Sequence, residues 1–142
     1  MVQVVLDTNV PVAALRSKRG ASNQLLRTMG QGLWKANISV ALALEYEDVL
    51  KRANIVPGIS EADPDVFLEY LFKASNLTPI VPRRRPSLRD PDDQRMLEVA
   101  LECRATIITH NTRDFAGVEH LGIGVQAPGE FLKALRTVDE QR

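Results

Sequence analysis

The sequence lacks the features that mark several specialised classes of protein. Its 142 residues include one cysteine, Cys103, which excludes an internal disulfide and is typical of a reducing cytosol. No apolar run approaches the roughly 20 residues of a membrane-spanning helix, and the first residues have no signal-peptide pattern. The 18 basic and 18 acidic residues cancel, so the net charge does not favour polyanion binding. We therefore expect a cytoplasmic protein outside the membrane, in which any contact with nucleic acid is local.

Motifs for nucleotide cofactors and for zinc are also missing. Gly20, Gly30 and Gly32 form no phosphate-binding fingerprint, and His110 and His120 do not have the spacing of zinc ligands. There is no internal repeat or low-complexity segment. The remaining composition, 44% apolar and 25% charged, is that of a globular chain with one core.

Strand-like and helix-like segments alternate along the chain. Short apolar runs predict strands at residues 2–6, 34–39, 77–81 and 106–109, with a short fifth strand at 124–126. Helical spacing predicts helices at residues 11–15, 21–29, 41–53, 65–75, 91–103 and 128–138. This alternation predicts an α/β fold, a three-layer sandwich with a mostly parallel central sheet of four to five strands. We assign residues 1–138 to a single domain and residues 139–142 to a polar C-terminal tail.

Polar residues follow two of the predicted strands. Open parallel sheets bind ligands at the carboxyl ends of their strands, where Asp7 follows the first strand and Asn111 and Asp114 follow the fourth. The alternative for Asp7 and its neighbours is a turn with a helix cap, and Asp114 has a similar alternative as a turn residue. These positions alone therefore do not define a site.

The helix at residues 41–53 contains one acid without an ordinary partner. Glu47 and Asp48 are each followed four positions later by a basic residue, Lys51 and Arg52, which predicts two surface ion pairs. The residue four positions after Glu45 is apolar, so Glu45 lies beside the apolar face of the helix that is expected to be buried. It must therefore pair with a cation or reach a polar cleft.

The helix at residues 91–103 has acids in its first turn. Asp90 is predicted as the N-cap and Pro91 as the first helical residue. Acids at a helix start are favoured by the macrodipole, which is the alternative explanation for Asp93. Asp93 nevertheless precedes Met96 and Leu97 by three and four positions, so it should project along the inward face of the helix.

Three acids from separate elements, Asp7, Glu45 and Asp93, are thus predicted to face one edge of the sheet. Two carboxylates about 5 Å apart repel by about 3 kcal/mol at an effective dielectric near 20, so such a group favours a bound cation. Oxygen ligands without thiolate or histidine suit Mg²⁺ or Mn²⁺. These ions support phosphodiester hydrolysis by activating water.

The order of these motifs resembles the PIN domain family. The resemblance covers residues 2–132 and is closest to the small VapC-like proteins classed as toxins of toxin–antitoxin pairs. It rests on the ordered segments at residues 5–9, 45–50, 90–100 and 107–115. The resemblance implies a Mg²⁺- or Mn²⁺-dependent ribonuclease, usually a homodimer and often held inactive by a cognate antitoxin.

Residue roles follow from the same resemblance. The implied metal-binding and catalytic acids are Asp7, Glu45 and Asp93, with Asp114 as a fourth, and Asn9 and Thr109 support Asp7 by hydrogen bonds. Asn111 departs from the pattern, because many family members have an acid there. An Asn can still coordinate through its carbonyl oxygen, but the site then carries one charge less and a second metal ion is less expected.

The function predicted from the sequence is a metal-dependent endoribonuclease that cleaves single-stranded RNA. Its candidate RNA contacts are four arginines of the loop at residues 82–89, namely Arg83, Arg84, Arg85 and Arg89. The alternative is that these side chains are only solvated, as charge runs in loops commonly are. One alternative is a non-catalytic RNA-binding or assembly module with a degenerate metal site, which Asn111 favours. Another is a phosphatase or phosphotransferase, which would need a second acid near Asp7, where Asn9 stands instead.

Overall fold

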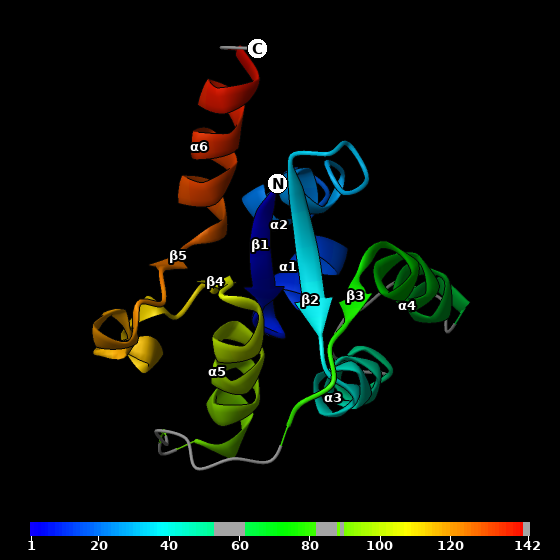
Figure 1. Ribbon diagram of the computed structural model, residues 1–142. Helices are drawn as coiled ribbons and strands as arrows, with labels where there is room; N and C mark the ends of the chain where they lie inside the picture. Colours follow the sequence, from blue (N-terminus) through cyan, green and yellow to red (C-terminus); the bar gives the residue numbers. More distant parts are fainter. Residues whose placement is uncertain (53–61, 82–87, 89, 141–142) are drawn as a thin grey trace.

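The computed structural model describes residues 1–52, 62–81, 88 and 90–140, and all structural statements below concern these residues (Figure 1). The strands are β1 (Val2–Leu6), β2 (Trp34–Ile38), β3 (Asn76–Leu77), β4 (Thr106–Ile108) and β5 (Val125–Gln126). The α-helices are α1 (Asn9–Arg16), α2 (Ala21–Leu26), α3 (Val40–Leu50), α4 (Ala62–Ala74), α5 (Pro91–Cys103) and α6 (Pro128–Glu140). Two short 3₁₀ helices, η1 (Thr112–Phe115) and η2 (Val118–Leu121), follow β4.

The strands form one sheet in the order β3-β2-β1-β4-β5, and the pairings of its described residues are all parallel. In the register, Val4 of β1 lies opposite Ala36 of β2 on one side and opposite Thr106 of β4 on the other. This confirms the predicted α/β fold with a parallel sheet, and the strand count is the higher of the two expected. β1 occupies the centre, so the residues that follow it lie in the middle of the carboxyl edge.

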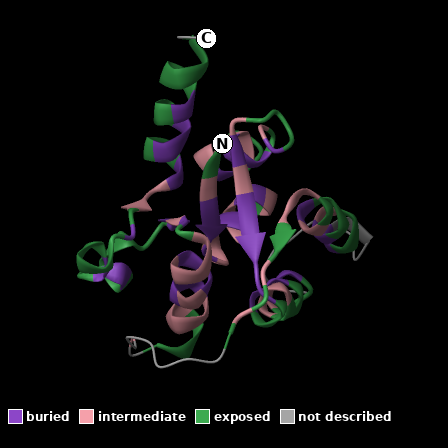
Figure 2. Ribbon diagram, viewed as in Figure 1, coloured by how far each residue is buried: buried purple, intermediate pink, exposed green. Residues whose placement is uncertain are grey.

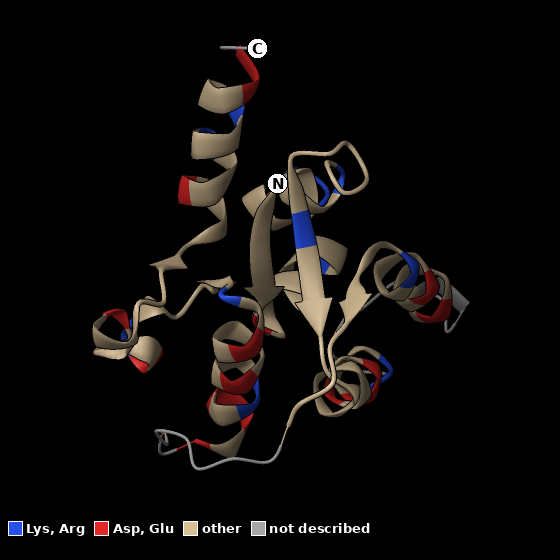
Figure 3. Ribbon diagram, in the orientation of Figure 1, with Lys and Arg blue, Asp and Glu red and all other residues tan. Residues whose placement is uncertain are grey.

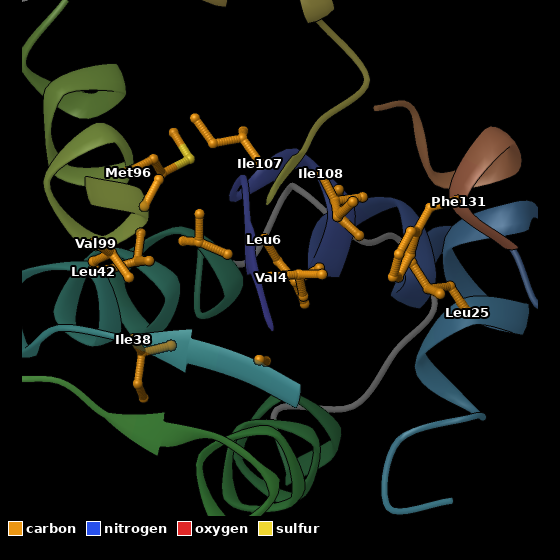
Figure 4. Packing of buried hydrophobic residues seen from close by; sticks show 14 of the residues in the cluster. Val4, Leu6, Leu25, Ile38, Leu42, Met96, Val99, Ile107, Ile108 and Phe131 are labelled. Carbon is orange, nitrogen blue, oxygen red and sulfur yellow. The ribbon is translucent and has the colours of Figure 1, made fainter. Parts of the chain in front are cut away.

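Helices cover both faces of the sheet. α5 packs across β1, β2 and β4, whereas α2 packs against α1 and α6. Figure 4 shows Ile107 pointing toward Met96 of α5 and Ile108 pointing toward Phe131 of α6. Successive side chains of β4 therefore point to opposite faces of the sheet, as the two-residue period of a strand requires.

The core is continuous across these layers, as the buried strand residues in Figure 2 show. Val4, Val5 and Leu6 of β1 are all buried, which explains the uninterrupted apolar run of this strand. Cys103 packs against the edge of the core, and its Sγ lies 3.2 Å from Thr78 Oγ1. Within the described ranges, no helix combines the length and the apolar character needed to cross a lipid bilayer.

The third strand differs from the prediction. A strand over residues 77–81 was expected, but β3 ends at Leu77, and the last backbone bond along it runs from the Thr78 N–H to the Ile38 carbonyl at 2.6 Å. β2 ends at Ile38 because Ser39 caps α3 by accepting a hydrogen bond from the Leu42 N–H at 3.1 Å. Among the described residues, β2 therefore does not extend far enough to lie opposite residues 79–81, whatever their apolar character.

Several helix ends also differ. α1 begins two residues earlier than predicted, α2 stops at Leu26, α3 stops at Leu50 and α4 begins at Ala62. α6 continues to Glu140, so the first two residues of the predicted C-terminal tail are helical. The start of α5 is confirmed, because Asp90 Oδ1 accepts a hydrogen bond from the Asp92 N–H at 2.8 Å and Pro91 opens the helix.

Candidate active site

Asp7 lies directly after β1, at the carboxyl edge of the sheet. Its side chain is buried, and the residue is only 8% exposed. Its Oδ2 accepts hydrogen bonds from Thr109 Oγ1 at 2.7 Å and from Asn9 Nδ2 at 3.1 Å. Burial raises the pKa of Asp7; hydrogen bonds from Thr109 and from the backbone of Thr8 and Asn9 oppose this effect, and the charge of Asp114 adds to it.

Thr109 and Asn9 connect the loop after β1 to the loop after β4. Thr109 is fully buried, and its Oγ1 also accepts a hydrogen bond from the Asn111 N–H at 2.9 Å. Asn9 Oδ1 accepts a hydrogen bond from the His110 N–H at 3.3 Å. The predicted supporting residues therefore surround Asp7, although Asn111 does so through its backbone while its side chain is exposed.

Glu45 reaches the site from α3. Its side chain is only 9% exposed. Oε2 accepts a hydrogen bond from Thr8 Oγ1 at 2.6 Å, and Oε1 lies 3.5 Å from Arg95 Nη1. Burial, together with the nearby Asp92, raises the pKa of Glu45 to about 7, and the hydrogen bond from Thr8 and the charge of Arg95 limit the rise. The acid predicted to need a partner thus has two.

Asp93 and Asp114 approach Asp7 from other elements. Burial raises the pKa of Asp93 to about 6, with further contributions from the charges of Asp90, Asp114, Asp7 and Asp92. Asp114 lies exposed on η1, and its charge raises the pKa of both Asp7 and Asp93. Asp7, Asp93 and Asp114 are therefore close enough to repel one another.

The site has two parts. Asp7, Asp93 and Asp114 interact through their charges, while Glu45 interacts with Asp92 and Arg95 and reaches the loop after β1 through Thr8. Figure 3 shows that acidic residues gather on α5 and α3, the helices next to the carboxyl ends of β1 and β2.

Some residues of the site were not expected from the sequence. Thr8 and Arg95 contact Glu45 across 37 and 50 positions, so no local spacing indicates them. The Tyr46 hydroxyl donates a hydrogen bond to the Leu6 carbonyl and so ties α3 to the end of β1. Asp92 is exposed but bonds to Arg95 at 3.1 Å. The four arginines predicted as RNA contacts are not placed, because residues 82–87 and 89 lie outside the described ranges.

A pocket of about 450 Å³ adjoins Glu45 between α3 and α5. It contains the acids Asp48 and Asp92 together with the bases Arg52 and Arg95. Arg52 Nη2 is bound to Asp48 Oδ2 at 2.7 Å, as the sequence spacing predicted. The pocket, called the α3–α5 pocket below, extends the carboxyl edge of the sheet toward the start of α5.

The donor chemistry of these residues suits a hard divalent cation. All the acids offer oxygen, and burial with mutual repulsion raises the pKa of Asp7 and Asp93, so a cation nearby would stabilise their charged forms. Within the described residues, however, no three acidic, histidine or cysteine side chains are already spaced to hold one ion. The residues therefore fit a cation by their chemistry, whereas their positions alone do not define an ion site.

Comparison with known proteins gives one family and several related folds. A family model described as PIN domain matches residues 3–113, a range that includes Asp7, Glu45 and Asp93 and ends one residue before Asp114. The structure of VapBC2 from Rickettsia felis, bound to a DNA fragment from its promoter, contains a chain with a TM-score of 0.62 and 12% identity, and the match covers 89% of this chain and 98% of that one. VapBC-1 from nontypeable Haemophilus influenzae gives a TM-score of 0.58 at 16% identity, covering 90% and 98% respectively. No curated protein matches the sequence.

Proposed function

The chain is a member of the PIN domain family of nucleases, and from this membership we propose that it is a metal-dependent endoribonuclease that hydrolyses single-stranded RNA. One observation carries the proposal: acids from three separate elements, Asp7, Asp93 and Asp114, lie close enough at the carboxyl edge for their charges to add to burial in raising the pKa of Asp7 and Asp93. Such a group is costly unless it binds a cation.

In this proposal Asp7, Glu45, Asp93 and Asp114 hold Mg²⁺ or Mn²⁺. The ion supplies an activated water and offsets the charge of the scissile phosphate. The chain itself orients the ligands: Thr109 and Asn9 fix Oδ2 of Asp7 by hydrogen bonds.

Thr8 holds Glu45 at the site through a hydrogen bond of 2.6 Å. The hydrogen bond from the Tyr46 hydroxyl to the Leu6 carbonyl keeps α3 against the end of β1. Asp7 and Glu45 therefore approach the site from elements that are fixed to each other, which favours a defined geometry for the reaction.

The proposal extends to partners. Both similar structures are of VapBC pairs, which supports a cognate antitoxin for this chain, and we propose a homodimer in the cytoplasm. Arg83, Arg84, Arg85 and Arg89 remain proposed contacts to RNA phosphates. A small neighbouring gene that encodes a DNA-binding protein would support the toxin–antitoxin assignment.

The direct test is cleavage of a labelled single-stranded RNA with Mn²⁺, comparing the wild type with Asp7→Asn and with Asp48→Asn. Asp48 forms a surface ion pair with Arg52, so its variant is the matched control for loss of an acid. We expect cleavage by the wild type and by Asp48→Asn, and none by Asp7→Asn. Equal activity of all three proteins, or no metal-dependent cleavage by the wild type, would contradict the proposal.

A non-catalytic RNA-binding module is the second candidate, and Asn111 favours it because it supplies no charge to the site. Asn111→Asp distinguishes the two. If the loop after β4 faces the ion, the added carboxylate should tighten Mn²⁺ binding by about 1–2 kcal/mol in titration calorimetry. The protein would be the binding module if the wild type binds RNA without binding Mn²⁺ and if Asn111→Asp gains no affinity for Mn²⁺.

A further inference from the structure

Arg95 uses only part of its guanidinium within the protein. Nη1 lies 3.5 Å from Glu45 Oε1 and 3.1 Å from Asp92 Oδ1. Within the described part of the chain, Nε and Nη2 of Arg95 have no hydrogen-bond partner. An arginine carries five N–H donors in a planar fork, so the edge formed by Nε and Nη2 is available to a ligand.

The free edge belongs to a residue that is accessible. The side chain of Arg95 is 41% exposed and lines the α3–α5 pocket beside Glu45. Arg52 lines the same pocket but is bound to Asp48, four positions earlier in the chain, at 2.7 Å. Among the described basic residues, Arg95 alone forms an ion pair with one of the acids assigned to the active site.

The contact between Arg95 and Glu45 is weak for an ion pair. Charge-assisted hydrogen bonds between nitrogen and a carboxylate are about 2.7–2.9 Å long, and this one is 3.5 Å. The side chain can therefore turn toward another anion while Nη1 keeps its shorter contact to Asp92. A phosphate suits the planar fork of arginine, because two parallel N–H groups match two phosphate oxygens.

The acids that line the pocket make a contact between a base and the phosphate necessary for an RNA strand to lie there. Glu45, Asp48 and Asp92 would repel a phosphodiester strand that passes through the pocket. Of the two bases that line it, Arg95 has the longer ion pairs, 3.1 Å and 3.5 Å against 2.7 Å for Arg52, and both contacts of Arg95 use Nη1. A volume of about 450 Å³ is in the range of small-molecule sites and accommodates part of a nucleotide.

We propose that Arg95 is a substrate-binding residue whose Nε and Nη2 groups bind a phosphate of the RNA strand in the α3–α5 pocket. The inference rests on the proposed function, since it takes RNA as the substrate. It assigns the side of the site on which the strand lies, between α3 and the start of α5.

The test measures binding of a labelled single-stranded RNA by fluorescence anisotropy at several salt concentrations, with Ca²⁺ in place of Mn²⁺. We expect Arg95→Gln to weaken binding by about tenfold, the loss of one charged hydrogen-bonded contact. The slope of log affinity against log salt should fall by about 0.7, the value for one phosphate contact to a single strand. Arg52→Gln is the matched control from the same pocket and should change neither quantity appreciably. Arg95→Lys keeps the charge but not the fork, so it should restore the salt slope and only part of the affinity.

Other outcomes separate this proposal from the one before it. An unchanged salt slope in Arg95→Gln, with a lower melting temperature, would make Arg95 a structural link between α3 and α5 and overturn the inference. Equal losses in Arg95→Gln and Arg52→Gln would also overturn it, because binding would then follow general charge. If the wild type binds RNA with the expected slopes but does not cleave it with Mn²⁺, the nuclease proposal fails while the role of Arg95 stands.

Discussion

Thr109 shows how much a single hydroxyl can contribute at the residue scale. It is fully buried, donates to Asp7 and accepts from the Asn111 N–H. Thr109→Val keeps the shape but removes both hydrogen bonds, and Asp7 then keeps only its bonds from Asn9 and the backbone, so we expect a loss of about 1–3 kcal/mol in the free energy of unfolding. RNA cleavage should fall as well, because Asp7 loses its orientation. Thr109→Ser is the control, since it keeps the hydroxyl; if chemical denaturation gives the same stability for both variants, the hydroxyl is not what matters.

The raised pKa of Glu45 predicts how stability varies with pH in metal-free protein. The folded chain binds this proton more tightly than the unfolded chain, since the pKa rises from 4.5 to about 7. The resulting stability is present below the unfolded pKa and is lost as the pH rises through the folded pKa. Allowing for solvent screening, we expect a decrease on the order of 1 kcal/mol between these pH values, measured by urea unfolding. Glu45→Gln should flatten this part of the profile, and an unaltered profile would assign the decrease to other groups.

Asp93 and Asp92 are adjacent acids with opposite expected effects. Burial and, after it, the charges of the neighbouring acids raise the pKa of Asp93. Asp93→Asn should therefore remove a buried charge and its repulsion and leave the metal-free melting temperature at neutral pH unchanged or higher, while RNA cleavage is lost. Asp92→Asn removes the 3.1 Å contact to Arg95 and should not stabilise the protein. A clear drop in melting temperature for Asp93→Asn would instead indicate that the charge of Asp93 stabilises α5 by interacting with the helix dipole.

At the scale of secondary structure elements, the N-cap of α5 positions the site. Asp90 accepts a hydrogen bond from the Asp92 N–H, which fixes the first turn that carries Asp93. Asp90→Ala should cost about 1 kcal/mol in the free energy of unfolding, as loss of a cap does. Asp90→Asn retains the cap without the charge and should keep most of the stability, as measured by thermal unfolding. Equal losses in both variants would attribute the effect to the charge of Asp90.

The same elements show what a sequence pattern can predict. β1 and α5 have the bounds expected for them, because a buried apolar run and an Asp-Pro cap are local signals. β3 is shorter than expected because its length depends on where β2 ends, which is decided by the cap at Ser39. The inward position of Glu45 followed from helical spacing, whereas its partners Thr8 and Arg95 depend on how α3 packs against the loop after β1 and against α5.

At the scale of the whole molecule, metal binding should be linked to global stability. A cation that binds only the folded chain stabilises it by about 2.7 kcal/mol at a hundred times its dissociation constant. For a domain of this size, that corresponds to a rise in melting temperature of roughly 5–10 °C. We expect Mn²⁺ to produce this rise in calorimetry, EDTA to reverse it, and Asp7→Asn to abolish it. An equal rise for the wild type and Asp7→Asn would place the ion elsewhere.

The position of β1 in the sheet has a consequence for the timing of activity during synthesis. β1 precedes the other described strands in the chain, yet it lies in the centre, between β2 and β4. Asp7 receives its hydrogen bond from Thr109, which is 102 positions later in the chain. While the ribosome is still translating the chain before Thr109, one flank of β1 is open and the acids of the later elements have not joined it. A chain that has not yet been extended to Thr109 therefore has no assembled site, and the proposed nuclease cannot attack the message that encodes it before that point.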